Sequence, residues 1–216
     1  MAGGTIQAVI FDLDGVLADT ASLHCRAWRR LAGEIGVPFD ERVNERLKGI
    51  DRMTSLEIIL EQAGRPATQA EKARLAERKN GYYRDLIDRL TPDDLLPGAL
   101  DALADARSAG LNVALASASR NAPMLLRRLD IASRFDYIAD PAKAAPKPDP
   151  ALFLAAARGV GALASTCIGV EDALAGVRAV KAAGMVAVGI GDPAVLGEAD
   201  HVLPTIADFH IQRYLG

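Results

Sequence analysis

The feature of this sequence that most limits its possible folds is an apolar run, starting at Ile6, that ends in two aspartates and Gly15. The run is rich in β-branched residues, which indicates a buried strand, and Gly15 predicts the loop that closes it. Alternation along the strand places Asp12 and Asp14 on the same side, at the carboxyl end, where open α/β sheets bind their ligands. Two carboxylates in a dry cleft repel each other unless a cation or a shared proton lies between them. The stretch therefore predicts an acidic sheet edge that holds a metal ion.

Length and charge limit the class of protein. The chain has 216 residues, 50% of them hydrophobic, and a net charge of −3. This length predicts one domain, or one domain plus a small second one. The arginine pairs at 29–30 and 127–128 are scattered surface charges, which argues against nucleic-acid binding. No apolar run reaches the roughly 20 residues of a membrane span and no signal-like segment precedes the first strand, so we expect a cytoplasmic monomer that binds no membrane.

The elements after the first strand are of two kinds. Residues 20–95 predict helices only, because their apolar positions recur at helical spacing. Later in the chain, helices alternate with predicted strands at 111–116, 135–138, 166–170 and 185–190. This alternation predicts an α/β fold with a parallel, doubly wound, Rossmann-like sheet and right-handed crossovers. We therefore expect an α/β catalytic core of residues 1–19 and 96–216, with residues 20–95 inserted as an all-helical cap.

Four groups of polar residues follow predicted strands. They are Asp12 with Asp14, then Ser117, then Lys147, and finally Glu171 with Asp172. Loops at the carboxyl ends of parallel strands meet at one edge, so we expect these side chains to lie close together. Each group also has a simpler interpretation: acids cap helices, serines form turns, and a lysine among prolines can be a solvated loop charge. Their joint occurrence in this order favours a shared catalytic site.

The pattern Phe-Asp-Leu-Asp-Gly-Val at 11–16, with the later groups in order, resembles the four motifs of the haloacid dehalogenase-like phosphotransferases. The resemblance implies that Asp12 attacks phosphorus and becomes an aspartyl phosphate, while Asp14 protonates the leaving oxygen. It also implies that Ser117 donates to the transferring phosphoryl oxygens and that Lys147 supplies positive charge.

The same resemblance implies a magnesium cofactor. The Mg²⁺ ligands would be Asp12, the backbone carbonyl of Asp14, and Asp172, with Glu171 as a direct or water-bridged ligand. Oxygen donors of this kind suit a hard divalent cation, which can bridge a carboxylate and a phosphate oxygen.

Other segments narrow the resemblance to the β-phosphoglucomutase family. They are His24 with 26–28, then 47–52, 79–80, 114–119 and 138–141. The resemblance implies an isomerase of carbohydrate metabolism that interconverts β-glucose 1-phosphate and β-glucose 6-phosphate through β-glucose 1,6-bisphosphate. The alternatives are a Mg²⁺-dependent sugar-phosphate phosphatase of the same fold and a non-catalytic phosphosugar-binding regulator.

A mutase must hold the second phosphate of a bisphosphate while the sugar reacts at the first, so it needs a distal anion site. Arg52 is the candidate in the cap, because a guanidinium can bind phosphate through a fork of two N–H groups. The other implied substrate-binding residues are His24, Lys48, Gly49, Ile50, Lys79, Ala118, Ser119, Arg120 and Asn121. Lys48 before Gly49 also fits an ordinary helix end, and His24 alone would be read as a surface or packing residue.

The chain departs from the mutase pattern at two points. Arg120 stands where the pattern has lysine, which keeps the charge but alters its reach. The loop before Lys147 lacks a serine and is one residue shorter than the pattern. We expect the Lys147 ammonium still to reach the transferring phosphate. The connectors near 19–20 and 91–96 are the expected hinges of cap closure.

Overall fold

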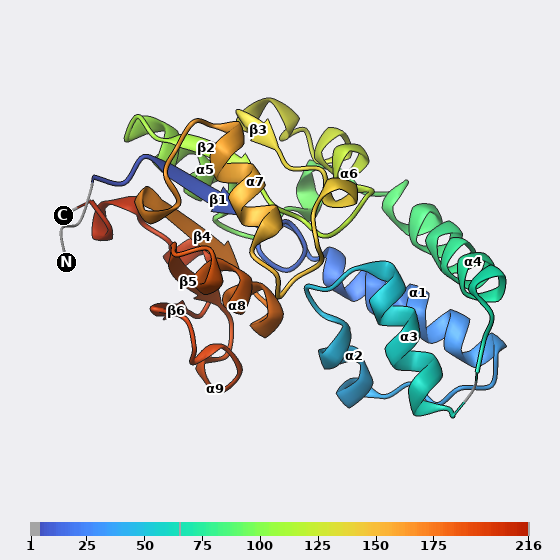
Figure 1. The fold of residues 1–216 in the computed structure, drawn as a ribbon. Coiled ribbons are helices and arrows are strands. Elements are labelled where there is room, and N and C mark those ends of the chain that lie inside the picture. Colours follow the sequence, from blue (N-terminus) through green and yellow to red (C-terminus); the bar gives the residue numbers. More distant parts are fainter. Residues whose placement is uncertain (1–4, 65, 216) are drawn as a thin grey trace.

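The computed structural model describes residues 5–64 and 66–215, and its centre is a parallel sheet (Figure 1). The strands are β1 (Ala8–Phe11), β2 (Asn112–Leu115), β3 (Tyr137–Ile138), β4 (Cys167–Glu171), β5 (Val186–Ile190) and β6 (His201–Leu203). In the described part of the chain they form a six-stranded sheet of order β3-β2-β1-β4-β5-β6, and each neighbouring pair is parallel. The predicted doubly wound sheet is confirmed. The sequence pattern did not predict β6, because three residues at a sheet edge carry too short an apolar pattern.

Helices cover both faces of the sheet. They are α5 (Ala99–Ser108), α6 (Ala122–Arg128), α7 (Ala151–Gly159), α8 (Leu174–Ala182) and the short α9 (Pro193–Leu196). Val9 and Phe11 of β1 pack in one buried apolar cluster with residues of α5 and α6, whereas Ala8 and Ile10 pack in another with residues of α7 and α8. Because β1 is buried on both faces, its sequence is a continuous apolar run rather than an alternating one.

A group of helices lies beside the sheet, to its right in Figure 1. These helices are α1 (Thr20–Glu34), α2 (Glu41–Leu47), α3 (Arg52–Gln62) and α4 (Gln69–Ile87). They share their own apolar cluster, which includes Trp28, Leu31, Leu56 and Ile59. For the described residues of this part, the expectation of helices without strands is confirmed, and we call α1–α4 the helical unit. The exact cap boundaries at 20 and 95 remain a prediction.

Short polar side chains begin each of these helices. Asp40 accepts a hydrogen bond from Val43 N at 2.9 Å, and Asp51 accepts one from Met53 N at 2.8 Å. Such caps satisfy backbone N–H groups that have no partner within the helix. At α1 the cap is Asp19, and Thr20 is the first helical residue.

The two chain connections between the sheet and the helical unit run side by side. Ala18 and Leu95 form an antiparallel bridge, and Leu96 N donates to Leu17 O at 2.9 Å. Paired connections of this kind can flex together, which fits their predicted role as hinges.

The remaining chain forms short turns and loops. The 3-10 turns are η1 (Pro92–Asp94), η2 (Ala132–Arg134), η3 (Pro141–Lys143), η4 (Ala164–Thr166), η5 (Ile206–Asp208) and η6 (Ile211–Arg213). Among the residues that the structure describes, no helix has the length and apolar composition to cross a membrane.

The strand order places the site. The chain proceeds outward from β1 through β2 in one direction and through β4 in the other, and such a switch opens a crevice at the carboxyl ends of the strands. Phe11 pairs with Leu115 on one side and with Val170 on the other. The residues that follow these three positions therefore emerge at the same level of the sheet edge.

Candidate active site

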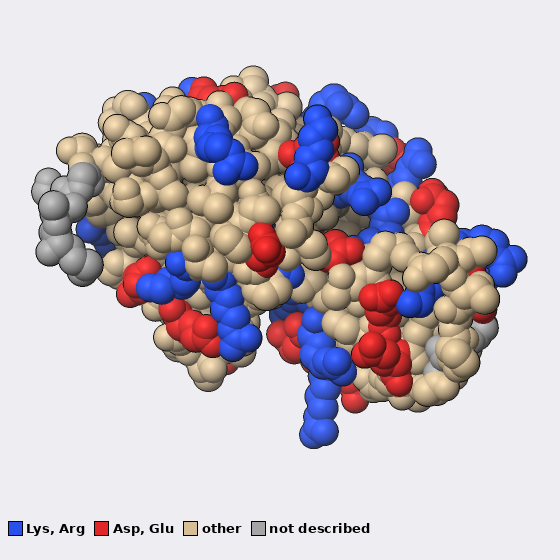
Figure 2. All heavy atoms as spheres, viewed as in Figure 1, with Lys and Arg blue, Asp and Glu red and all other residues tan. Residues whose placement is uncertain are grey.

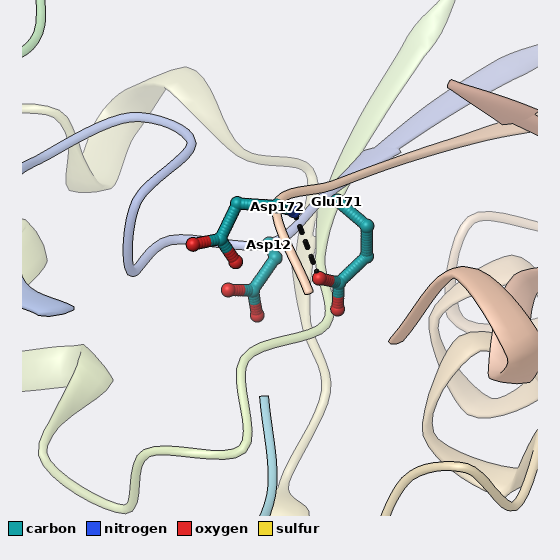
Figure 3. Close-up of side chains that lie close together, drawn as sticks. All are labelled: Asp12, Glu171 and Asp172. Carbon is teal, nitrogen blue, oxygen red and sulfur yellow. Dashed lines mark hydrogen bonds between the residues drawn. The ribbon is translucent and has the colours of Figure 1, made fainter. Parts of the chain in front are cut away.

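Three carboxylates converge at the ends of β1 and β4 (Figure 3). Asp12 follows β1, Glu171 is the last residue of β4, and Asp172 comes next; one oxygen atom of each lies within 4.8 Å of the others. Asp12 and Glu171 are buried. Burial and the neighbouring carboxylates raise the pKa of Asp172 well above its ordinary value. Burial, together with Asp12 and against the opposing effect of Lys147, raises the pKa of Glu171 to about 7.

Lys147 reaches this cluster from the loop before α7. Its Nζ lies 2.9 Å from Asp12 Oδ1 and 2.5 Å from Glu171 Oε1. Burial alone would lower the pKa of Lys147, but the charges of Asp12 and Glu171 outweigh it and hold the pKa above its ordinary value. The shorter loop therefore still brings the ammonium to the nucleophile candidate. The peptide bond between Lys147 and Pro148 is cis.

Backbone groups fix the position of the acidic pair. Glu171 Oε2 accepts hydrogen bonds from Asp172 N at 3.0 Å and Ala173 N at 3.2 Å. Gly15, at a φ of +77°, leaves room for Asp172, because a Cβ atom there would lie 2.0 Å from Asp172 Oδ2. The Gly15 that closes the first motif is thus required both by its backbone conformation and by close contact.

The donor set fits a hard divalent cation. Three carboxylates gather where the contacting ammonium of Lys147 can neutralise only part of their charge. Both oxygens of Glu171 are engaged by Lys147 and backbone N–H groups. Asp12 and Asp172 are therefore the residues best placed to hold a metal ion, with Glu171 behind them.

The Asp14 side chain lies apart from this cluster and forms a network of its own. Its carboxylate accepts from Thr20 Oγ1 at 2.5 Å, Ser117 Oγ at 3.4 Å and Tyr83 OH at 3.5 Å. Burial and the charge of Asp12 raise the pKa of Asp14 to about 6. A carboxyl group with such a pKa can carry a proton near neutral pH, which an acid catalyst needs. The proposed metal contact of Asp14 concerns its backbone carbonyl, and that part stays a prediction.

His24 and Lys79 lie next to Asp14. Lys79 Nζ is 2.6 Å from His24 Nδ1, and His24 Nε2 is 3.7 Å from Asp14 Oδ1. The His24 ring stacks on Tyr83 with 3.8 Å between ring centroids. Burial and the charges of Lys79 and Arg52 keep the pKa of His24 well below 6.5. A neutral His24 that accepts at Nδ1 from Lys79 carries its proton on Nε2, the nitrogen nearer to Asp14.

These groups line a pocket of about 490 Å³ between the sheet edge and the helical unit. Figure 2 shows basic and acidic side chains along the junction of the two parts. The predicted residues on the pocket wall are Asp12, Asp14, His24, Lys48, Gly49, Ile50, Arg52, Lys79, Ala118, Ser119, Arg120, Lys147 and Asp172. Within the described chain, the lining residues do not include the other three predicted ones, Ser117, Asn121 and Glu171.

Each of those three side chains lies behind the wall. Ser117 Oγ donates to Asp14 and accepts from Ser119 N at 3.1 Å. Asn121 Nδ2 donates to Asn80 Oδ1 at 3.0 Å, and Glu171 supports Lys147. In this arrangement they position neighbouring groups, and direct contact with a ligand stays a prediction.

Two guanidinium groups line another part of the pocket, which we call its distal end. Arg52, the first residue of α3, projects from the helical unit, and Arg120 comes from the core loop before α6. Burial lowers the pKa of Arg52, and the nearby charge of Arg120 lowers it further, whereas Glu77 raises it. Lys48 is the C-cap residue of α2 and pairs with Glu45 at 2.5 Å. It also lines the pocket, so the two interpretations of Lys48 are compatible.

Sequence reasoning missed Thr20, Tyr83 and Glu77, whose side chains contact predicted site residues. Thr20 and Tyr83 contact Asp14, and Glu77 contacts Arg52. Tyr83 is four residues after Lys79 on α4, so helical spacing could have placed it on the same face. Glu77 carries no comparable pattern, because its partner lies on another helix.

A family model described as haloacid dehalogenase-like hydrolase matches residues 6–184. The chain belongs to the haloacid dehalogenase-like hydrolases. The predicted superfamily resemblance is confirmed, and the carboxylates, serine and lysine described above occupy the motif positions on which that resemblance was based.

Relatives of this haloacid dehalogenase-like chain include mutases and a phosphatase. A β-phosphoglucomutase of Bacillus subtilis is 47% identical, with 96% of this chain and 93% of that protein covered. A phosphorylated carbohydrates phosphatase of Thermotoga maritima is 33% identical, with 83% and 82% covered. The crystal structure of β-phosphoglucomutase from Clostridium difficile superposes with a TM-score of 0.94 at 43% identity, over 97% of this chain and 95% of that one. The narrower resemblance to β-phosphoglucomutases is also confirmed.

Proposed function

We propose that this protein is a β-phosphoglucomutase, which interconverts β-glucose 1-phosphate and β-glucose 6-phosphate through β-glucose 1,6-bisphosphate. The observation that carries the proposal is that one pocket of about 490 Å³ is lined by two different groups of charged residues. Asp12 and Lys147 are in contact in one group, and Arg52 lies near Arg120 in the other. A sugar bisphosphate carries an anion at each end, which suits this distribution. The 47% identity to a protein named β-phosphoglucomutase supports the same activity.

The proposed chemistry begins at Asp12. One carboxylate oxygen attacks phosphorus, a bond from phosphorus to Asp12 forms, and the bond to the sugar oxygen breaks. Asp14 gives its proton to that leaving oxygen and takes one back from the other hydroxyl when the sugar attacks the aspartyl phosphate. The pKa of about 6 for Asp14, raised by burial and the charge of Asp12, supports this double role.

Other residues hold the reacting groups. Lys147, 2.9 Å from Asp12, supplies positive charge beside the transferring phosphoryl oxygens, and Ser117 donates from the opposite loop. His24 directs Nε2–H toward Asp14 and, with Thr20, orients that carboxyl group. The guanidinium groups of Arg52 and Arg120 bind the second phosphate.

The proposed cofactor is Mg²⁺. Asp12, Asp172 and the Asp14 backbone carbonyl would hold it, with Glu171 acting directly or through water. The convergence of three carboxylates within 4.8 Å supports a divalent ion in this place. When bound, such an ion would offset the negative charge shared by carboxylate and phosphate.

Closure of the helical unit over the sheet edge would exclude water and protect the aspartyl phosphate from hydrolysis. The paired connections at Ala18 and Leu95 support a hinge there. Sugar phosphates are the proposed partners of the pocket. Cytoplasmic location and a monomeric state stay predictions from the sequence.

A sugar-phosphate phosphatase is the second candidate, because a relative 33% identical to this chain is named a phosphorylated carbohydrates phosphatase. The two activities share the Asp12 chemistry and differ in whether sugar or water attacks the aspartyl phosphate.

A coupled assay on β-glucose 1-phosphate with Mg²⁺ separates these candidates. Glucose 6-phosphate and free phosphate are read separately, with and without a glucose 1,6-bisphosphate primer. We expect primer-dependent formation of glucose 6-phosphate that far exceeds phosphate release. Equal rates of the two products would favour the phosphatase, and the absence of any aspartyl phosphate after exposure to the bisphosphate would favour a non-catalytic binder.

A further inference from the structure

The carboxylate of Glu77 faces the guanidinium of Arg52 at the distal end of the pocket. Arg52 Nη1 and Glu77 Oε2 are 3.7 Å apart, and both residues line the pocket. Glu77 lies on α4 and Arg52 begins α3, so the pair joins two helices of the helical unit. The group that we assign to the distal phosphate therefore already has an anionic neighbour within the chain.

Glu77 also connects to the core. Its Oε1 is 3.5 Å from Asn80 Nδ2, and Asn80 Oδ1 accepts from Asn121 Nδ2 at 3.0 Å. Asn121 belongs to the predicted substrate-binding set. Two residues predicted to meet the distal anion, Arg52 and Asn121, are thus joined through side chains of α4.

The charge distribution gives Glu77 an electrostatic role. Arg120 lies close enough to Arg52 for their like charges to repel. The Glu77 carboxylate opposes that repulsion, as a phosphate between the two guanidinium groups would. A phosphate and the Glu77 carboxylate therefore compete for the same positive charge.

We propose that Glu77 competes with the distal phosphate for Arg52. The Glu77 carboxylate pairs with Arg52 until a phosphorylated sugar binds and displaces it. The proposal rests on the proposed mutase function, because it requires a distal phosphate. It makes Glu77 a residue that sets affinity: the bisphosphate is held less tightly, so it leaves and rebinds in the opposite orientation more readily.

The geometry fits an exchangeable contact. The Glu77 side chain is 70% exposed and the Arg52 side chain 25% exposed. Exposed ion pairs are weak and contribute about a 2- to 5-fold change in an equilibrium constant. A phosphate, with more charge and more acceptor oxygens than a carboxylate, can displace such a partner.

The first test compares Glu77→Gln with a matched control, Glu57→Gln. Glu57 lies on α3 with Arg52, is outside the pocket lining, and pairs with Lys72 at 2.7 Å. Both variants remove one negative charge from the helical unit. We expect the KM for β-glucose 1-phosphate, measured with saturating primer, to fall about 2- to 5-fold in Glu77→Gln and to stay unchanged in Glu57→Gln. A KM that rises, or that changes equally in both variants, would overturn the proposal.

The second test does not depend on turnover. Glucose 1,6-bisphosphate is titrated by calorimetry into Asp12→Asn and into the double variants that add Glu77→Gln or Glu57→Gln. We expect the dissociation constant to fall about 2- to 5-fold with Glu77→Gln only. If the wild-type protein shows no interconversion, the proposed function fails while this titration still decides the role of Glu77. If interconversion is present and the three dissociation constants agree, only the competitor role fails.

Discussion

The two ends of the pocket hold their cations in opposite ways. At the sheet edge, Lys147 is buried and lies 2.9 Å and 2.5 Å from carboxylates that are themselves buried. At the helical unit, Arg52 is partly exposed and lies 3.7 Å from the exposed Glu77. Charge attraction is strong where water is excluded and weak where water and salt screen it. The reacting end is thus preorganised, whereas the distal end is free to exchange partners.

This difference suits a ligand that must react at one end and be released at the other. A buried cluster around Asp12 keeps the proposed nucleophile and its donors in place before the substrate arrives. A screened pair at Arg52 yields to phosphate at small cost. Burial, rather than residue type, separates the two roles.

The largest expected effect comes from breaking the reacting end at Asp12. Asp12→Asn removes the proposed nucleophile, so we expect interconversion to fall roughly 10⁴-fold or more. Mass spectrometry after exposure to glucose 1,6-bisphosphate should find no phosphorylated protein in this variant and a phosphorylated fraction in the wild type. Substantial activity in Asp12→Asn would show that another group attacks phosphorus.

Lys79 tests how burial acts on a cation that has no carboxylate in contact. Burial and the charge of Arg52, against the smaller effect of Asp14, lower its pKa from 10.5 to about 7. We expect one lysine side chain to titrate near pH 7 in NMR spectra of protein labelled at lysine Cε, and this resonance to be absent in Lys79→Met. Above that pH, the neutral Lys79 amine can still donate an N–H to His24 Nδ1.

The sign of the stability effect follows from that pKa. The unfolded chain holds the Lys79 proton up to pH 10.5, whereas the folded protein releases it near pH 7. Between these values the unfolded state binds more protons, so the free energy of unfolding contributed by this residue rises with pH. Lys79→Met should lose this rise. A wild-type protein whose lysines all titrate near pH 10 would contradict the prediction.

Replacing the cation at each end by methionine compares how much each cation contributes to stability. Lys147→Met leaves buried carboxylates without their cation and should lower the free energy of unfolding by about 3–5 kcal/mol in the absence of divalent metal. Arg52→Met removes a partly exposed charge and should change it by about 1 kcal/mol or less. Urea unfolding in EDTA measures both variants. Equal losses would mean that burial does not distinguish the ends.

A further effect is on substrate binding at the distal end. Arg52→Met removes charge-assisted hydrogen bonds to phosphate, so the KM for β-glucose 1-phosphate should rise about 10- to 100-fold. Arg178→Met serves as the control, because Arg178 pairs with Glu198 on the surface of the core. Steady-state kinetics with saturating primer checks this expectation. An unchanged KM would show that Arg52 does not bind the distal phosphate, and it would favour a phosphatase over a mutase.

Sequence reasoning succeeded where local pattern and topology coincide. The apolar run before Asp12 predicted a buried strand, and the later motifs followed strands of the same sheet. Because parallel strands bring their carboxyl ends to one edge, Lys147 and Asp172 could be expected beside Asp12 without coordinates. The helices of the helical unit followed from apolar periodicity in the same way.

Other features escaped prediction for physical reasons. The three-residue strand β6 is too short for a periodic pattern. The Asp14 carboxylate was grouped with the metal ligands by strand alternation, yet the loop at Gly15 turns it toward Thr20 and Tyr83. The hydrogen bond from Asn121 to Asn80 had no signal in the sequence, and the expected contact of Asn121 with an anion stays a prediction. Each outcome depends on a loop or on the packing of a distant helix.

The sequence by itself determined the chemistry of the reacting end, because its residues are tied to strand ends whose relative positions follow from a parallel sheet. Only the tertiary structure decided how charge is balanced at the distal end. Glu77 and Arg52 lie on different helices, and their contact depends on how α3 and α4 pack. Packing between helices is a long-range property that leaves no local pattern in the chain, so the internal partner of the distal arginine becomes visible only in the folded protein.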